Sequence, residues 1–278
     1  MSDNYILKIV CNDEQGLIYK ISKILFENTL NVEKNNEFVD LENGKFFYRA
    51  KIAGELDYEK ITKELKKVLP KNSKINLLKR KKRDIIIMVT KESHAIGDIL
   101  IKHYSGKLNA NIVAVISNHN LLRDLVKKFH IPYHHISHEN LNRLSHEEKI
   151  LQILSQYNFD YIVLAKYMRI LSSSFVESFN EKIINIHHSF LPAFIGANPY
   201  KQAYQRGVKI IGATAHFVNN NLDEGPIIAQ DVITVNHNFS WRDMQKAGAD
   251  VESNVLSKAI NIVLDDKIFI YDNKTIIF

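Results

Sequence analysis

Cysteine is nearly absent from this sequence, which limits both its chemistry and its environment. Cys11 is the only cysteine of the 278 residues, so the chain contains no internal disulfide. This composition fits a reducing compartment, and we expect a cytoplasmic protein. The simplest role for Cys11 is that of a small apolar side chain in a core. A disulfide-stabilised scaffold is excluded.

Proline, glycine and long apolar runs are also scarce. Five prolines and ten glycines are too few for a low-complexity chain, whereas 45% apolar residues suffice for a folded core. No window contains 18 consecutive apolar residues, so we expect no transmembrane helix and no membrane partner. The polar start, Met1-Ser2-Asp3-Asn4, has no basic flank leading into an apolar segment, so we expect no secretion signal.

The positive charge is concentrated in one segment. The net charge is +6, and the run Lys79-Arg80-Lys81-Lys82-Arg83 accounts for five of those charges. No aromatic residues alternate with it to stack on bases, so a solvated linker explains the run better than a nucleic-acid-binding arm. We therefore expect no nucleic-acid partner. Because the chain exceeds the usual size of one domain, we expect two domains, residues 1–80 and 81–278.

Residues 1–80 carry the pattern of a small domain. Alternating and helical spacings of apolar residues predict strand, helix, strand, strand, helix and strand, in that order, at residues 5–11, 17–25, 32–39, 46–52, 61–69 and 75–78. Gly44 favours a hairpin between the second and third strands because glycine readily adopts a positive φ. This order is that of a ferredoxin-like βαββαβ unit.

The turn Asp13-Glu14-Gln15-Gly16-Leu17, in this order of elements, resembles the ACT regulatory domain family. The resemblance implies a domain that pairs its sheet with that of another copy and binds a small amino acid at the interface. A purely structural explanation accounts for the same residues without a ligand, since Gly16 frees the backbone and Asp13 caps the next helix. An amino-acid effector and a homo-oligomer are therefore expectations that rest on the resemblance.

Residues 81–278 alternate short apolar runs with helical patterns, which is typical of a parallel α/β sheet. Three runs indicate strands buried on both faces, at residues 85–89, 112–116 and 161–164. Regularly spaced apolar residues predict a long helix from Trp241 to Val263, and a terminal hairpin begins near Phe269. The predicted fold class is α/β, with a Rossmann-like, mostly parallel domain after the ferredoxin-like one.

Polar side chains follow the apolar pair Ile183-Ile184 at the carboxyl end of a predicted strand. Ligands of open parallel sheets bind at such ends, which places Asn185 and His187 in a candidate site. A side-chain amide can stabilise the oxyanion that forms when a carbonyl carbon is attacked. An imidazole with a reference pKa of about 6.5 can accept a proton from water and return it to a leaving nitrogen. The pair therefore suits attack on a formyl or acyl carbonyl.

A second segment supplies another imidazole and a carboxylate. His216 lies near the end of an apolar run, and Asp223 follows in the turn Leu222-Asp223-Glu224-Gly225-Pro226. A carboxylate can hold a catalytic imidazole in orientation, so we predict that Asp223 orients His187 and that His216 supports the site. Any one of these residues alone is more readily explained as part of the structure. Their combination predicts one divided catalytic site.

These residues closely resemble the catalytic pattern of the 10-formyltetrahydrofolate-dependent formyltransferases over residues 84–278, at Asn185-Ile186-His187, Ser189, Leu191-Pro192, His216 and Asp223. The resemblance implies that Asn185, His187 and Asp223 are catalytic. Residues 165–171 look like the strand of that family whose backbone meets the pterin. The residues implied to bind folate are Met168, Arg169, Ile170, Leu171 and His216.

The ACT-like segment in front, together with His188 in Asn-Ile-His-His-Ser-Phe-Leu-Pro, makes nearly the whole chain similar to the hydrolytic, deformylase branch of this family. This similarity implies hydrolysis of 10-formyltetrahydrofolate to formate and tetrahydrofolate. It also implies a supply of formate for purine biosynthesis and a balance of one-carbon folate pools. The reactants would be the folate substrate and water, with no cofactor.

Two other functions are compatible with parts of the sequence. A formyltransferase to a small amine would use the same catalytic residues. Glycinamide ribonucleotide formyltransferases have a glycine-rich turn after the first core strand for the acceptor's phosphate, but here Val89 is followed by Thr90-Lys91-Glu92-Ser93-His94. Glu92 would repel a phosphate. An amino-acid sensor with an inactive catalytic domain rests only on the ACT-like segment, and the intact catalytic set argues against it.

Four histidines suggest a metal site, but their surroundings do not. No thiols or carboxylates are spaced to complete a ligand shell around His130, His134, His135 and His138, so we predict no metal. Asn198 stands where the deformylase pattern leads us to expect a lysine, within a candidate lid from Pro192 to Pro199. His188 either tunes the neighbouring base or packs against this loop.

Overall fold

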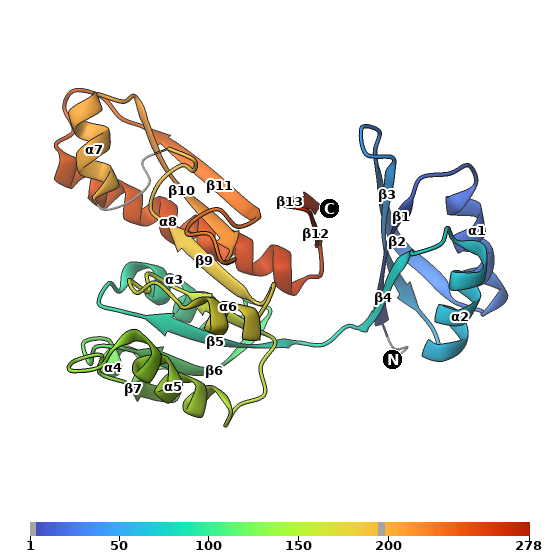
Figure 1. Cartoon of the computed structure of the whole chain (residues 1–278), viewed down its shortest axis with the longest axis horizontal. Coiled ribbons are helices and arrows are strands. Elements are labelled where there is room, and N and C mark those ends of the chain that lie inside the picture. The colour runs from blue at the N-terminus through green and yellow to red at the C-terminus, as the bar shows by residue number, and fades with distance from the viewer. Residues whose placement is uncertain (1–3, 194–197) are drawn as a thin grey trace. The chain divides into compact units, whose positions relative to one another are not determined.

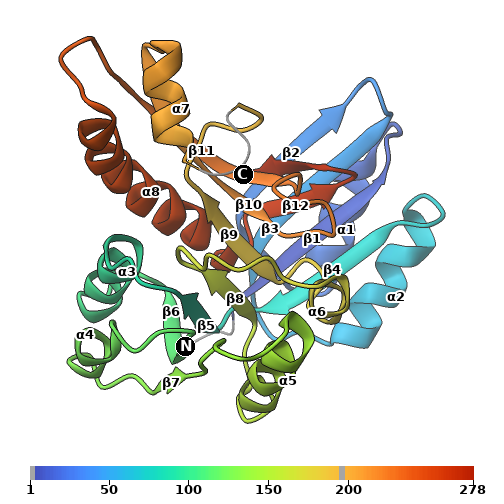
Figure 2. The same ribbon diagram turned by 60° about the vertical axis from the view of Figure 1, so that its left-hand side comes forward.

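The computed structural model describes residues 4–193 and 198–278. Its contacts divide the chain into two units, one formed by Met1–Lys81 with Phe278 and the other by Lys82–Ile277. Figures 1 and 2 show the elements of each unit from two directions. Within the described ranges, no helix is long and apolar enough to cross a bilayer.

The first unit contains a four-stranded antiparallel sheet with both helices on one face (Figure 1). Its elements are β1 (Asn4–Asn12), α1 (Leu17–Glu27), β2 (Asn31–Asp40), β3 (Lys45–Ala53), α2 (Tyr58–Val68) and β4 (Lys74–Lys79). The strand order β2-β3-β1-β4 is that of a ferredoxin-like unit, so the predicted βαββαβ fold is confirmed. Leu7, Ile9 and Ile21 lie fully buried in its core.

The turn between β1 and α1 depends on glycine. Gly16 has a φ of 86°, a left-handed conformation that glycine adopts without a steric penalty. No side chain caps α1, so the prediction that Asp13 caps this helix is wrong. The backbone N–H of Asp13 instead donates to the carbonyl of Gly44 at 2.9 Å. This bond extends the β1–β3 ladder, which assigns Asp13 to the end of a strand pair rather than to the helix.

The second unit is built on a seven-stranded sheet in the order β11-β10-β9-β8-β5-β6-β7. Five neighbouring strands, from β9 to β7, are parallel, while β10 runs antiparallel to both β9 and the edge strand β11. The predicted mostly parallel sheet is therefore confirmed. The strands are β5 (Arg83–Val89), β6 (Ala110–Ser117), β7 (Tyr133–His135), β8 (Tyr161–Leu164), β9 (Ile183–His187), β10 (Ile210–Phe217) and β11 (Ile227–Thr234).

Helices cover both faces of this sheet. Successive residues of β5 therefore pack into two different cores. Ile85 and Ile87 pack in the core that includes α3 and α8, whereas Ile86 and Met88 pack in the core that includes α5 and α6. The helices are α3 (His94–Tyr104), α4 (Arg123–Lys127), α5 (Arg143–Leu154), α6 (Ser173–Ser178), α7 (Pro199–Arg206) and α8 (Trp241–Leu264). The predicted terminal hairpin consists of β12 (Ile268–Tyr271) and β13 (Lys274–Ile277).

Arg83 differs from what the charge run predicts. It begins β5 and is largely buried, with its guanidinium 3.0 Å from a carboxylate oxygen of Asp266 and 3.3 Å from one of Asp160. A solvated linker is therefore the wrong description of this residue. Two carboxylates neutralise the cation where the first strand of the second unit begins, and the sequence run alone does not reveal them.

Candidate active site

Strand β9 presents Asn185 and His187 on one face. Alternate residues of a strand share a face, and Ile184 and Ile186 on the other face belong to the core with α8. Asn185 lies opposite His216 of β10, and His187 lies opposite Thr214. Both polar residues stand at the carboxyl end of β9, as predicted.

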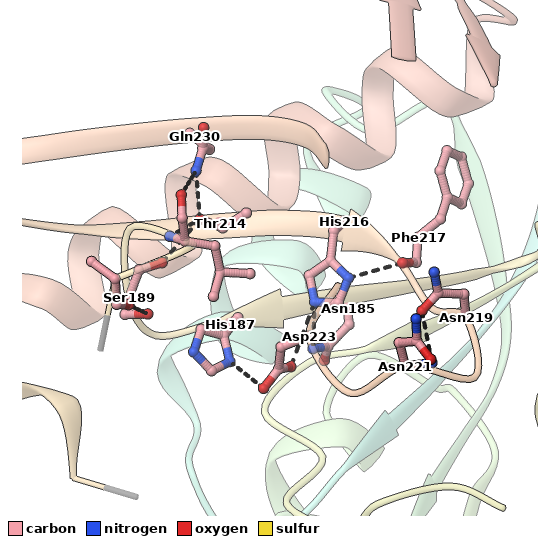
Figure 3. A network of polar contacts seen from close by, with 12 residues as sticks. Asn185, His187, Ser189, Thr214, His216, Phe217, Asn219, Asn221, Asp223 and Gln230 are labelled. Atoms are coloured by element: carbon pink, nitrogen blue, oxygen red, sulfur yellow. Dashed lines mark hydrogen bonds and ion pairs between the residues drawn. The ribbon is translucent and has the colours of Figure 1, made fainter. Parts of the chain in front are cut away.

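A β-bulge shapes the neighbouring strand at His216. The pairing of β10 with β11 shifts register between Ala215 and His216. Nδ1 of His216 lies 2.8 Å from the carbonyl oxygen of Phe217, and Nε2 lies 3.2 Å from Nδ2 of Asn185 (Figure 3). Because a carbonyl only accepts, Nδ1 carries the proton and Nε2 of the neutral ring accepts from Asn185. The amide of Asn185 is thereby oriented, and its second N–H can donate to a ligand.

Asp223 reaches the same group from the turn between β10 and β11. Its Oδ2 lies 3.3 Å from Nδ1 of His187, and its Oδ1 lies 3.7 Å from Nε2 of His216 (Figure 3). Burial alone would raise the pKa of the Asp223 carboxyl. The hydrogen bond from Nδ1 of His187 outweighs that effect, and the pKa of Asp223 lies well below its usual value. The structure therefore brings the three predicted catalytic residues together around an ionised carboxylate.

The other ring nitrogen of His187 is left for a ligand. Nε2 is buried and has no hydrogen-bond partner within residues 4–193 and 198–278. Since Nδ1 faces the Asp223 carboxylate, it carries the proton, and Nε2 is the basic nitrogen of the neutral ring. A buried acceptor without a partner costs free energy, so this atom suits a ligand or a water molecule.

Gly225 allows the Asp223 turn to approach β10. A Cβ atom at this position would lie 1.7 Å from the carbonyl oxygen of Phe217 and 3.3 Å from Nδ1 of His216. The backbone N–H of Phe217 also donates to the carbonyl of Pro226 at 2.9 Å. Glycine at this position therefore sets the path by which Asp223 reaches His187.

The predicted folate-binding residues border the same cavity of about 930 Å³ as the predicted catalytic residues. Residues 165–171 form a loop after β8, so the expectation of a strand there is wrong. Lys166 has a φ of 61°, which turns the chain out of the β conformation. Met168 and Ile170 are 58% and 53% exposed, and a loop has backbone groups that are not engaged in a ladder. All five residues predicted to bind folate line this cavity, namely Met168, Arg169, Ile170, Leu171 and His216.

A hydrogen-bond network that the sequence did not indicate secures the chain after β9. The Thr214 hydroxyl donates to the carbonyl of Ser189 at 2.9 Å and accepts from the backbone N–H of Leu191 at 3.0 Å. The Gln230 amide donates to the carbonyl of Leu191 and to the Thr214 hydroxyl (Figure 3). These bonds fix the segment that directly follows His187 to β10 and β11. Residues 194–197 of the predicted lid lie outside the described residues.

His188 is held in its neutral form. Burial and, after it, the nearby ammonium of Lys166 lower the pKa of His188 to about 4. Its ring centroid lies 5.1 Å from that of His187 and 6.3 Å from that of Tyr200. His188 therefore joins the predicted catalytic residues to a second group of side chains around Tyr200.

Known proteins share this arrangement of fold and sequence. Residues 83–260 match the protein family described as "Formyl transferase". Formyltetrahydrofolate deformylase of Haemophilus influenzae is 51% identical over 277 residues, which cover 100% of both chains. The chain belongs to the formyltetrahydrofolate deformylase family. The predicted enzyme class, a hydrolase on a formyltransferase fold, is confirmed with it.

Solved structures extend the likeness to both units of this deformylase family member. A formyltetrahydrofolate deformylase from Pseudomonas syringae pv. tomato aligns with a TM-score of 0.95 and 34% identity, covering 100% of this chain and 95% of that one. Glycinamide ribonucleotide transformylase 1 from Symbiobacterium toebii aligns with a TM-score of 0.67 and 26% identity. The alignment covers 70% of this chain and 94% of the transformylase. The fold of the catalytic unit is thus common to both kinds of enzyme.

The histidines considered as metal ligands have other neighbours. His134 shares a hydrogen bond of 2.7 Å with the Tyr157 hydroxyl, and Nδ1 of His138 lies 3.4 Å from the Asn118 amide. Across the described part of the chain, no group of three or more histidine, cysteine, aspartate or glutamate side chains could hold a metal ion.

Sequence reasoning missed a buried carboxylate that borders the cavity. Glu252 lies on α8 and is only 1% exposed. The apolar stripe of α8 predicts a core helix, and it gave no reason to single out this glutamate. Its only sequence signal is its position directly after Val251, three residues before the stripe continues at Val255.

Proposed function

We propose that the chain hydrolyses 10-formyltetrahydrofolate to formate and tetrahydrofolate at Asn185, His187 and Asp223. The observation that carries the proposal is the surroundings of the two ring nitrogens of His187. Its Nδ1 faces the Asp223 carboxylate, and its buried Nε2 has no partner among the described residues. Because His187 also borders the cavity, Nε2 is the base available to a bound substrate.

The first step is the addition of water to the formyl carbon. Nε2 of His187 accepts a proton from the water as its oxygen bonds to that carbon, and the carbonyl oxygen becomes negatively charged. The Asn185 amide donates an N–H to this oxyanion, while His216 holds the amide in place. The ionised Asp223 carboxylate stabilises the imidazolium that forms.

The second step is the departure of the folate nitrogen. The bond between the formyl carbon and N10 breaks, and the imidazolium of His187 returns its proton to that nitrogen. The formic acid that is released loses its proton to solvent, so formate and tetrahydrofolate are the products, and His187 is again neutral. Water is the only other reactant, so the proposed reaction needs no cofactor.

The loop after β8 is the proposed place for the pterin. Residues 166–171 lie outside the strands, and the apolar side chains of Ile170 and Leu171 border the cavity. Polar ring edges of a pterin need hydrogen-bonding partners, and its faces need apolar contact. Placed there, the substrate would present its formyl group to Asn185 and His187.

We also propose a metabolic and a regulatory context. The released formate would supply purine biosynthesis in the cytoplasm, and hydrolysis would balance one-carbon folate pools. A small amino acid would act as effector at the first unit of a homo-oligomer, for which the support is the ACT-like turn at Gly16. Calorimetry of the full chain with glycine and with methionine tests the effector. If neither amino acid gives a heat of binding, the result would count against it.

The decisive test is formate release from 10-formyltetrahydrofolate with no amine present. We expect turnover by the wild-type protein and none by His187→Ala. His237→Ala is the matched control, because His237 is exposed in the turn before α8 and does not border the cavity. Slow formate release that an added amine accelerates would point instead to a formyltransferase. Equal turnover by His187→Ala and the wild type would reject the site.

A further inference from the structure

Three donors converge on the buried carboxylate of Glu252. Its Oε1 accepts from the Tyr200 hydroxyl at 2.6 Å. Its Oε2 accepts from Nε2 of His94 at 2.8 Å and from the Lys166 ammonium at 3.1 Å. The four residues, called here the Glu252 cluster, all border the cavity that contains the proposed catalytic residues. The proposed reaction uses none of them.

The Glu252 cluster is assembled from four separate elements. His94 begins α3, Lys166 follows β8, Tyr200 lies on α7 and Glu252 lies on α8. Gly248 of α8 makes the approach of Tyr200 possible, because a Cβ atom at that position would lie 2.1 Å from the Tyr200 hydroxyl oxygen. Burial would raise the pKa of Glu252, but the three donors outweigh it and lower the value to about 2. The carboxylate is ionised and fixed in place.

The cavity therefore has two chemically different walls. One wall consists of apolar side chains, at Ile170, Leu171, Val176, Val218 and Leu222. This wall suits a flat heterocycle. The Glu252 cluster, together with Glu92, supplies a charged wall. His188 links that wall to the reacting group, since its ring lies close to the rings of both His187 and Tyr200.

The charged wall offers little to an incoming amine. The Glu252 carboxylate is already paired with three donors, and the Lys166 ammonium is already paired with Glu252. An acceptor would have to break these buried contacts, which leaves charged groups without partners. Water needs no such space and no such partners. We propose that the Glu252 cluster selects water as the nucleophile, by filling the side of the cavity from which an amine would reach the formyl carbon.

This proposal rests on the hydrolysis proposed above, and it predicts which reaction appears when the wall is opened. A primary amine would bond through its nitrogen to the formyl carbon, and the bond from that carbon to N10 would break. His187 would take a proton from the attacking amine and return it to N10. The products would be an N-formyl amide and tetrahydrofolate in place of formate and tetrahydrofolate.

The experiment measures how much of the formyl group each variant transfers to water and how much to an added amine. Glycinamide is added to 10-formyltetrahydrofolate, and formate and N-formylglycinamide are quantified against an enzyme-free control. Tyr200→Ala opens the wall, Tyr200→Phe removes only the hydrogen bond to Glu252, and Glu252→Gln removes the charge that holds Lys166. Tyr204→Ala is the matched control, because Tyr204 lies on the same helix, is exposed and does not border the cavity.

We expect the ratio of N-formylglycinamide to formate to rise at least about tenfold in Tyr200→Ala, and less in the other two wall variants. Wild type and Tyr204→Ala should both form almost only formate. An unchanged ratio in Tyr200→Ala and Glu252→Gln would overturn the proposal, as would folded wall variants that consume no substrate with either nucleophile. If Tyr200→Ala does not fold, Tyr200→Phe and Glu252→Gln are judged by the same ratio. Wild type that releases no formate without glycinamide would instead reject the proposed hydrolysis.

Discussion

Oδ2 of Asp223 lies 3.3 Å from Nδ1 of His187, although the two residues come from different parts of the chain. His187 ends β9, whereas Asp223 stands in the turn after β10. The contact directs the proton of the neutral imidazole to Nδ1 and leaves Nε2 as the base. Asp223 is thereby a positioning residue for His187, and its pKa, held well below the usual value, keeps it ionised near neutrality.

Replacing Asp223 with asparagine should reduce kcat by about 10²–10⁴-fold. An asparagine keeps the size of the side chain, but it neither stabilises an imidazolium nor fixes the tautomer of His187. Formate release at saturating substrate measures the effect. Asp231→Asn, on an exposed part of β11, is the control and should keep wild-type turnover. A wild-type kcat in Asp223→Asn would refute this role.

Replacing Asn185 with alanine should reduce kcat by about 10²–10³-fold with a smaller change in KM. The amide is proposed to donate to an oxyanion that exists only after water has added, so its loss should affect turnover more than substrate binding. Steady-state kinetics of formate release separates the two parameters. If KM rises while kcat is unchanged, Asn185 binds the substrate and does not stabilise the oxyanion.

Replacing Gly225 with alanine should displace the Asp223 turn. The new Cβ atom would overlap the carbonyl oxygen of Phe217, so we expect a loss of about 1–3 kcal/mol in the free energy of unfolding and a lower kcat. Gly97→Ala is the control, since that glycine lies in α3 with nothing within 4 Å of the added atom. It should be neutral, or stabilising by about 0.5–1 kcal/mol. Equal stability of the two variants would contradict the proposed overlap.

The stabilisation contributed by Glu252 should depend on pH. Its pKa is lowered from 4.5 to about 2, so the contribution is fully present above pH 4.5 and is lost as the pH falls toward the folded-state pKa. Urea unfolding of wild type and Glu252→Gln should differ by about 3 kcal/mol at pH 6, and the difference should narrow below pH 4.5. A difference that stays constant between pH 6 and pH 3 would show that the charge of Glu252 does not stabilise the fold.

Local sequence patterns were sufficient for the elements of the first unit and for part of the site. The apolar pair Ile183-Ile184 indicated β9, and the positions of Asn185 and His187 at its end followed from the usual location of ligands in open sheets. Sequence reasoning failed for residues 165–171, where the family resemblance implied a strand, because the left-handed φ of Lys166 turns the chain out of the β conformation. It also failed for Arg83, whose partners Asp160 and Asp266 are distant in the chain.

The sequence by itself determined the order of strands and helices in residues 1–80 and the chemical groups available for catalysis. These properties depend on local spacing and on residue type, which can be read along the chain. Only the tertiary structure decided that Asp223 meets His187 and that Tyr200, Lys166 and His94 converge on Glu252. Such contacts join residues far apart in sequence, and they exist only because the sheet and its helices pack in one particular register.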